Sequence, residues 1–148
     1  MTASQEMDPP LQRPVVLVAE DDEAVRELAR KVLVEAGMEV LCTRDGCEAV
    51  DRVRAEGGRI RVVVLDLMMP VMDGKTALRK IRRLQPDLPV VVASGLDGRQ
   101  VLGPELAAQV AVFLRKPYRS VELVEALRRA TRGDRMPTAT MELQGGRS

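Results

Sequence analysis

The sequence contains no histidine, and this absence excludes several classes of active site. A Ser-His-Asp triad or a Cys-His pair uses an imidazole as its general base, so neither can lie within this chain. Zinc and iron sites that are ligated by histidine are excluded for the same reason. The chain also lacks the phosphorylatable histidine that a histidine kinase or a histidine phosphotransfer domain requires.

Long apolar runs and a strong net charge are absent as well. No apolar run approaches the roughly 18 residues that a membrane-spanning helix needs, and residues 1–14 lack the apolar core of a signal peptide. We therefore expect a cytoplasmic protein that does not bind membranes. The net charge is only +1, and no aromatic side chains interleave with the arginines near the C-terminus. We therefore also expect no direct binding to nucleic acid.

Cysteine is scarce, and the two cysteines, Cys42 and Cys47, are expected to be free thiols. What the chain does contain is typical of one globular domain with tails: 148 residues, of which 45% are apolar and 30% are charged. We interpret residues 1–13 as a flexible lead-in, residues 14–132 as the folded domain and residues 133–148 as a disordered tail.

Short apolar runs alternate with helical stripes along the folded domain. Runs rich in β-branched residues predict strands over 15–19, 38–42, 61–65, 90–93 and 110–114. Apolar residues at helical spacing predict a helix that ends at Gly37, one capped by Asp45, one over 75–84, and one capped by Ser120. From residue 96 we expect a loop and then a short helix from about Pro104, because proline suits a first helical turn.

This alternation of five strands and five helices requires a parallel sheet with right-handed crossovers and helices on both faces. The predicted fold class is α/β: a flavodoxin-like (βα)5 doubly wound domain with a five-stranded parallel sheet of order 2-1-3-4-5. In such sheets the binding site lies at the carboxyl ends of the strands, beside the point where the strand order reverses.

Polar side chains follow four of the predicted strands. Glu20 and Asp21 follow the first strand, Asp66 the third, Ser94 the fourth and Lys116 the fifth. Three neighbouring carboxylates repel one another, and a hard divalent cation such as Mg²⁺ relieves that repulsion through oxygen ligands. Together with a lysine and a hydroxyl, this set suits the transfer of a phosphoryl group to a carboxylate.

These pieces resemble the CheY-like receiver domains of response regulators in two-component signal transduction. The matching motifs are Val-Leu-Val-Ala-Glu-Asp-Asp at 16–22, Leu65-Asp66-Leu67-Met68-Met69-Pro70 with Met72-Asp73-Gly74, Ser94-Gly95 and Lys116-Pro117. Each motif is short, and the specificity comes from their order and their places at the strand ends. The resemblance covers about Val15 to Thr131, which makes residues 14–132 the expected receiver domain.

The resemblance implies a role for each residue of the site. Asp66 is the phosphoacceptor in a reaction that depends on Mg²⁺ (or Mn²⁺). Asp21 is a direct metal ligand, Glu20 acts on the metal through water, and Met68 contributes its backbone carbonyl. Lys116 pairs with the phosphoryl group.

The resemblance also implies a switch and a class of partner. Ser94 moves toward the phosphate and the aromatic ring of Phe113 follows, which remodels the face formed by the fourth helix, fifth strand and fifth helix. The phosphodonor is a histidine kinase or a phosphotransfer protein. The downstream protein target is unknown, and a homodimer is an open alternative. The chain is either a stand-alone response regulator or the receiver segment of a hybrid histidine kinase.

Two apolar residues flank the expected site. Met68 stands two residues after Asp66, and Leu96 stands two residues after Ser94. In the family that the chain resembles, polar residues at these positions can help to orient the water that hydrolyses the phosphoryl group, whereas apolar residues should shield it. We therefore expect a phosphorylated state that lasts longer than in fast-resetting chemotaxis regulators. The resemblance implies a signalling phosphoacceptor domain with no enzymatic activity beyond self-catalysed phosphotransfer and slow autodephosphorylation.

Two other functions compete with this interpretation. A pseudo-receiver would use the same fold as a scaffold that is not phosphorylated, but such domains usually lose an acid, the hydroxyl or the lysine. A haloacid-dehalogenase-type phosphatase needs a second aspartate two residues after its nucleophile, and that position is Met68. A Rossmann-type cofactor site is disfavoured because no glycine-rich turn follows the first strand.

Overall fold

The structure is a computed structural model that describes residues 13–132, so the predictions for residues 1–12 and for the tail at 133–148 lie outside the described residues. Within residues 13–132 the elements are β1 (Val15–Ala19), α2 (Glu23–Glu35), β2 (Glu39–Thr43), α3 (Gly46–Glu56), η2 (Gly57–Arg59), β3 (Ile60–Asp66), α4 (Gly74–Leu84), β4 (Val90–Ser94), α5 (Gly98–Leu102), α6 (Pro104–Ala107), β5 (Val112–Arg115) and α7 (Ser120–Ala130). None of the helices in this range is long and apolar enough to cross a membrane.

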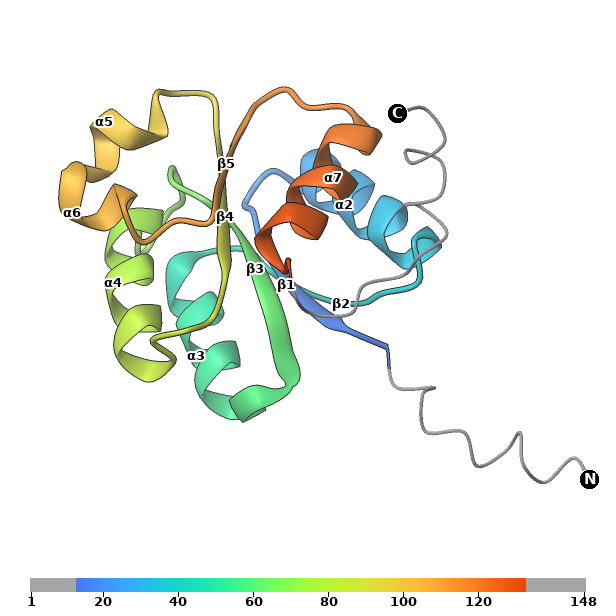
Figure 1. Ribbon diagram of the computed structural model, residues 1–148, viewed down its shortest axis with the longest axis horizontal. Coiled ribbons are helices and arrows are strands. Elements are labelled where there is room, and N and C mark those ends of the chain that lie inside the picture. The colour runs from blue at the N-terminus through green and yellow to red at the C-terminus, as the bar shows by residue number, and fades with distance from the viewer. Residues whose placement is uncertain (1–12, 133–148) are drawn as a thin grey trace, which may run out of the picture.

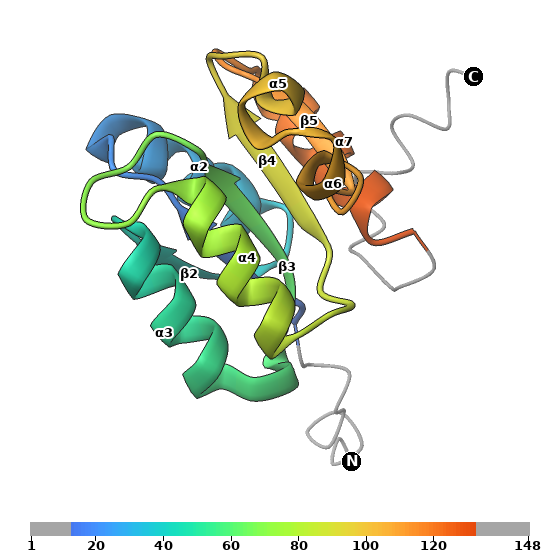
Figure 2. The same ribbon diagram turned by 90° about the vertical axis from the view of Figure 1, so that its left-hand side faces the viewer.

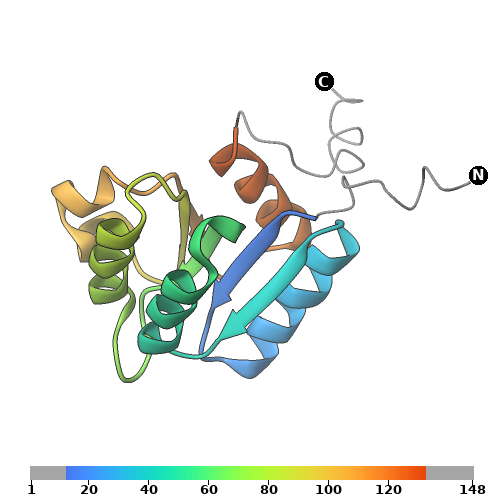
Figure 3. The same cartoon turned by 90° about the horizontal axis from the view of Figure 1, so that it is seen from below.

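The five strands form one parallel sheet in the order β2-β1-β3-β4-β5. Helices α2 and α7 pack on one face of the sheet, and α3, α4, α5 and α6 pack on the other (Figures 1 and 2). Figure 3 shows β1 and β2 side by side, with α2 and α3 on opposite faces. The predicted flavodoxin-like α/β fold and its strand order are confirmed.

The alternation of side chains along β1 builds the two halves of the core. Leu17 points into the layer beneath α3 and α4, whereas Val16 and Val18 point into the layer beneath α2 and α7. Every residue of β1 is buried, as expected for a strand covered by helices on both faces. Two packed layers therefore fix the strands, and the strands in turn fix the loops at their carboxyl ends.

Aspartate residues cap four of the helices that follow strands, α2, α3, α4 and α5. The side chains of Asp22, Asp45 and Asp73 accept hydrogen bonds from the backbone N–H groups of Val25 (3.1 Å), Glu48 (2.8 Å) and Thr76 (2.9 Å). Each cap satisfies an N–H group that has no partner within its helix. The predicted cap at Asp45 is confirmed.

The structure corrects the prediction for the last helix. Its N-cap is Arg119, not Ser120, which is the first helical residue. The reason is that the Glu122 carboxylate reaches back to the N–H of Arg119 at 2.7 Å and fixes the start of the helix one residue earlier.

The loop expected after residue 96 contains a helix that the sequence did not predict, α5. Asp97 starts this helix by accepting a hydrogen bond from the N–H of Arg99 at 3.2 Å. Gly103, with a φ angle of 86°, separates α5 from the predicted short helix at Pro104, α6. The fifth strand begins at Val112 rather than at Val110, because the N–H of Val110 bonds to Ala107 in the preceding turn.

Candidate functional site

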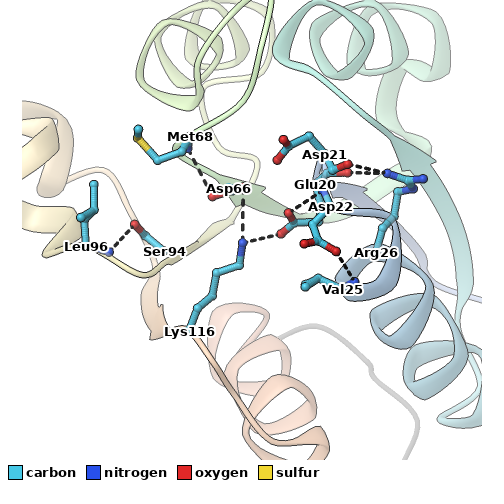
Figure 4. A network of polar contacts seen from close by, with 10 residues as sticks. All are labelled: Glu20, Asp21, Asp22, Val25, Arg26, Asp66, Met68, Ser94, Leu96 and Lys116. Carbon is cyan, nitrogen blue, oxygen red and sulfur yellow. Dashed lines mark hydrogen bonds and ion pairs between the residues drawn. The ribbon is translucent and has the colours of Figure 1, made fainter.

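The polar residues predicted from the strand ends all lie at the carboxyl edge of the sheet. The connections that follow β1, β3, β4 and β5 lie at the upper end of the sheet in Figure 1. Glu20 and Asp21 come directly after β1, Asp66 and Ser94 end β3 and β4, and Lys116 follows β5. Figure 4 shows the other four side chains gathered around Asp66.

Asp66 is almost completely buried, with 4% of its surface exposed. Its Oδ1 accepts a hydrogen bond from the backbone N–H of Met68 at 3.2 Å, and its Oδ2 lies 3.4 Å from Nζ of Lys116. A buried carboxylate needs such partners because it has lost its hydration. One oxygen is therefore oriented by the backbone of the loop and the other faces a cation.

A close backbone contact holds the loop after Asp66 in place. The N–H of Gly74 donates to the carbonyl of Leu67 at 3.0 Å. A Cβ atom at position 74 would lie 2.3 Å from the backbone oxygen of Asp66, which is too short for a contact between two non-bonded atoms. Glycine is therefore required where α4 begins, because the start of this helix packs directly against the end of β3.

Both carboxylate oxygens of Glu20 have a partner. Its Oε1 lies 2.7 Å from Nζ of Lys116, and its Oε2 accepts a hydrogen bond from the N–H of Asp22 at 3.0 Å. Burial raises the pKa of the Glu20 carboxyl and the Asp66 charge raises it further, whereas Lys116 and the N–H of Asp22 only partly offset this effect. Burial lowers the pKa of Lys116, but its hydrogen bond to Glu20 and the charges of Asp66 and Glu20 outweigh burial, so the net pKa is raised.

Asp21 completes a cluster whose donor atoms fit a hard divalent cation. Carboxylate oxygens of Glu20, Asp21 and Asp66 all lie within 4.8 Å of one another. Asp21 is exposed, and its carboxylate forms no hydrogen bond or ion pair with another residue of 13–132. An all-oxygen set of this kind suits Mg²⁺ or Mn²⁺. Met68 orients Asp66 through its N–H, and its carbonyl belongs to the same loop.

Ser94 and Lys116 are connected through the backbone. The N–H of Lys116 donates to the carbonyl of Ser94 at 2.9 Å. The Ser94 hydroxyl accepts a hydrogen bond from the N–H of Leu96 at 3.0 Å, which leaves its own proton free to donate to another group. Leu96 and Met68 are 47% and 59% exposed, so two apolar side chains lie at the rim of the buried site.

Phe113, the predicted switch residue, lies next to a pocket that Ser94 also lines. Its ring is half-buried, and the guanidinium carbon of Arg99 lies 4.4 Å from the ring centre. A Cβ at Gly98 would lie 2.9 Å from the ring, so α5 approaches Phe113 closely because it carries a glycine there. The sequence did not indicate this contact, because α5 itself was not predicted.

Arg26 is the polar residue near the site that the sequence analysis missed. The sequence analysis gave it no role, whereas in the structure its guanidinium group contacts the turn that carries Glu20 and Asp21. The available signal was its spacing of five residues after Asp21, about one turn into the helix. Cys42 and Cys47 are free thiols, as predicted.

Comparisons with known proteins agree with this geometry. Residues 16–128 match the family described as the response regulator receiver domain. Over 113 residues the chain is 37% identical to the response regulator MprA of Mycolicibacterium vanbaalenii, covering 76% of this chain and 48% of that protein. The chain therefore spans about half the length of the curated relatives it matches.

Solved structures show the same fold. The receiver domain of the hybrid histidine kinase CckA is 32% identical, with a TM-score of 0.68 over 80% of this chain and 99% of that one. The CheX-CheY-BeF3-Mg²⁺ complex of Borrelia burgdorferi contains a chain that is 26% identical, with a TM-score of 0.71 over 78% of this chain and 87% of that one. The sheet order, the family match and these relatives together show that the chain belongs to the response regulator receiver domain family of two-component systems.

Proposed function

We propose that Asp66 accepts a phosphoryl group from a phosphohistidine on a histidine kinase or a phosphotransfer protein. The observation that carries this proposal is the position of Asp66, which is buried at the carboxyl edge of the sheet between Lys116 and the acid pair Glu20 and Asp21. A carboxylate with only a structural role would not need a metal-competent acid pair and an ammonium group at the same place.

The residues of the chain define the transfer step. A carboxylate oxygen of Asp66 attacks phosphorus, the new P–O bond forms as the P–N bond of the donor breaks, and the imidazole leaves. The N–H of Met68 holds the carboxylate in position during the attack. Lys116, 3.4 Å from Asp66, would pair with an oxygen of the phosphoryl group as charge accumulates there.

The acid cluster supplies the remaining charge balance. Mg²⁺ (or Mn²⁺), held by Asp21 and Asp66 directly, by Glu20 through water and by the backbone carbonyl of Met68, would neutralise the charge of the phosphoryl oxygens. Because both Glu20 oxygens have partners, an indirect role for Glu20 is supported, and the Asp21 carboxylate, which has no partner among residues 13–132, supports a direct one.

The switch belongs to the same proposal. The Ser94 hydroxyl can exchange its bond with the N–H of Leu96 for a donated bond to the phosphoryl group. The shared pocket gives the Phe113 ring space to follow that movement. The face that changes comprises α5, α6, β5 and α7, and this face would present the signal to a downstream protein or to a second copy of the chain.

The context of the domain is also a proposal. The chain acts either as a stand-alone regulator or as a receiver segment of a hybrid kinase, in the cytoplasm where its phosphodonor is available. Its autodephosphorylation is slow, because Met68 and Leu96 shield the phosphoryl group.

A small donor with a P–N bond tests the transfer chemistry. Phosphoramidate should convert the protein to a slower band on a phosphate-affinity gel in Mg²⁺ and leave it unconverted in EDTA. Lys116→Ala should strongly reduce the rate, whereas Lys80→Ala, which removes an exposed lysine of α4, should leave it unchanged. Equal conversion with and without metal would contradict the proposed role of the acid cluster.

A further inference from the structure

Arg26 binds the backbone of the turn that presents the acid pair. Its Nη1 donates to the carbonyl oxygen of Glu20 at 2.9 Å and approaches the carbonyl oxygen of Asp21 at 3.4 Å. Figure 4 shows the guanidinium group on the other side of these two residues from Asp66 and Lys116. A single side chain on the first turns of α2 thus contacts two consecutive peptide groups.

Two carboxylates near Arg26 are at positions where they could form ion pairs with it, but they do not. Asp22 and Glu23 lie four and three residues before it, at spacings where helical ion pairs form readily. Arg30, the next arginine on the same helix, does pair with Glu27 in this way. Within residues 13–132, Arg26 forms no ion pair.

These contacts control the direction of the two carboxylates. The carbonyl of Glu20 belongs to the peptide that joins Glu20 to Asp21, and the carbonyl of Asp21 belongs to the next one. The sheet holds the preceding N–H, because Glu20 donates to the Thr43 carbonyl at 3.0 Å. Rotation of either of the following peptides would turn the Asp21 carboxylate away from Asp66, and mutual repulsion among the three acids favours that rotation.

We infer that Arg26 is a positioning residue for the metal site: it holds the Glu20–Asp21 turn in the orientation that a divalent cation requires. The inference rests on the proposed function, because it assumes that the acid cluster binds Mg²⁺ or Mn²⁺. Arg26 acts through the backbone and touches neither the metal ligand atoms nor Asp66. Its charge alone would have the opposite effect, since a nearby cation repels a bound metal ion.

Positioning of the turn and charge repulsion between Arg26 and the metal ion predict opposite effects of Arg26→Met on metal affinity. This substitution keeps a long side chain but removes the charge and the hydrogen-bond donors. Free Mn²⁺ is measured by electron paramagnetic resonance during a titration of the unphosphorylated chain of 148 residues. Positioning predicts that the Mn²⁺ dissociation constant rises by about 10-fold to 100-fold in Arg26→Met. Arg26→Lys should recover part of this loss, because an ammonium group can still donate to one carbonyl. Arg30→Met, one turn along the same helix, should bind Mn²⁺ as the wild type does.

Thermal unfolding in EDTA separates positioning from loss of fold. The inference expects Arg26→Met and Arg26→Lys to unfold at similar temperatures in EDTA while their Mn²⁺ affinities differ. It is overturned if Arg26→Met binds Mn²⁺ as tightly as the wild type or more tightly, or if Arg26→Lys recovers no affinity. Failure of the wild type itself to bind Mn²⁺ would overturn the proposed metal site together with this inference, whereas normal wild-type binding with an unaffected Arg26→Met overturns the inference alone.

Discussion

Glu20 and Asp21 are adjacent in the sequence but have different surroundings. Glu20 is buried and both of its carboxylate oxygens have partners, whereas Asp21 is exposed and its carboxylate has no partner among residues 13–132. The same sequence motif therefore provides one acid that orders Lys116 and one that is available to a metal ion. Glu20, directly after β1, is buried, whereas Asp21, one residue further along the turn, is exposed at the edge of the acid cluster.

Met68 provides the first test at the scale of single residues. It is 59% exposed at the rim of the site, where an apolar side chain cannot orient a hydrolytic water. Met68→Asn should shorten the lifetime of the phosphorylated state severalfold, measured as loss of the phosphorylated band after the donor is removed. The control Val34→Asn should not change this lifetime, because Val34 is an exposed apolar residue at the C-terminal end of α2 and the site lies beside the N-terminal end of that helix. A wild-type half-life of seconds that Met68→Asn leaves unchanged would contradict the proposed shielding.

Val71 provides a second test, of stability rather than chemistry. It has a φ angle of 67° and is 80% exposed, which is an unfavourable backbone conformation for a β-branched residue. Val71→Asn should stabilise the protein by about 1 kcal/mol, because asparagine adopts this conformation more easily. Chemical denaturation measures the gain. Val121→Asn, at a similarly exposed position in the helix α7, should give no such gain, and equal effects of the two substitutions would contradict the strain argument.

At the scale of elements, the first residue of α4 lies directly beside the phosphoacceptor position that we propose, Asp66. Its N-cap Asp73 accepts the N–H of Thr76, and the next residue, Gly74, lies against the backbone of Asp66. The position of the β3–α4 loop therefore depends on both the cap and the glycine. The Met72-Asp73-Gly74 motif, which helped to identify the site from the sequence, therefore also forms the connection between β3 and α4.

The cap at Asp73 can be tested by substitution and by pH. Asp73→Ala should lower the free energy of unfolding by about 1 kcal/mol, whereas Asp73→Asn should retain most of the cap. Hydrogen bonds from Thr76 lower the pKa of Asp73 below its ordinary value. Its contribution is therefore present above the unfolded pKa and is lost as pH falls through the lower, folded pKa. The gap in stability between wild type and Asp73→Ala should narrow in acid, and a gap independent of pH would show that the charged cap is not responsible.

At the scale of the whole molecule, the sequence predicted the fold and the members of the site because both depend on the order of elements. Short β-branched strands alternating with helices leave few topologies, and in a parallel sheet the strand ends that carry Asp21, Asp66 and Lys116 meet at one edge. The resemblance to receiver domains then supplied the roles that we propose for these residues.

What the sequence could not predict depends on contacts between distant side chains and on local backbone angles. The direction of the Arg26 side chain depends on the path of the Glu20–Asp21 turn. The contact between Arg99 and Phe113 depends on α5, which the local sequence did not predict. The cap of α7 was misplaced by one residue because the Glu122 carboxylate accepts a hydrogen bond from the N–H of Arg119, which makes Arg119 the N-cap.

The central claim is that Asp66 is the phosphoacceptor of a metal-dependent reaction. Intact-mass spectrometry after incubation with acetyl phosphate, with and without Mg²⁺, tests it on wild type, Asp66→Asn and the matched control Asp73→Asn. The account predicts a single adduct with the mass of one phosphoryl group in wild type and in Asp73→Asn, only in the presence of Mg²⁺, and none in Asp66→Asn. An adduct that persists in Asp66→Asn, or the absence of any adduct in wild type with either acetyl phosphate or a phosphorylated histidine kinase, would contradict it.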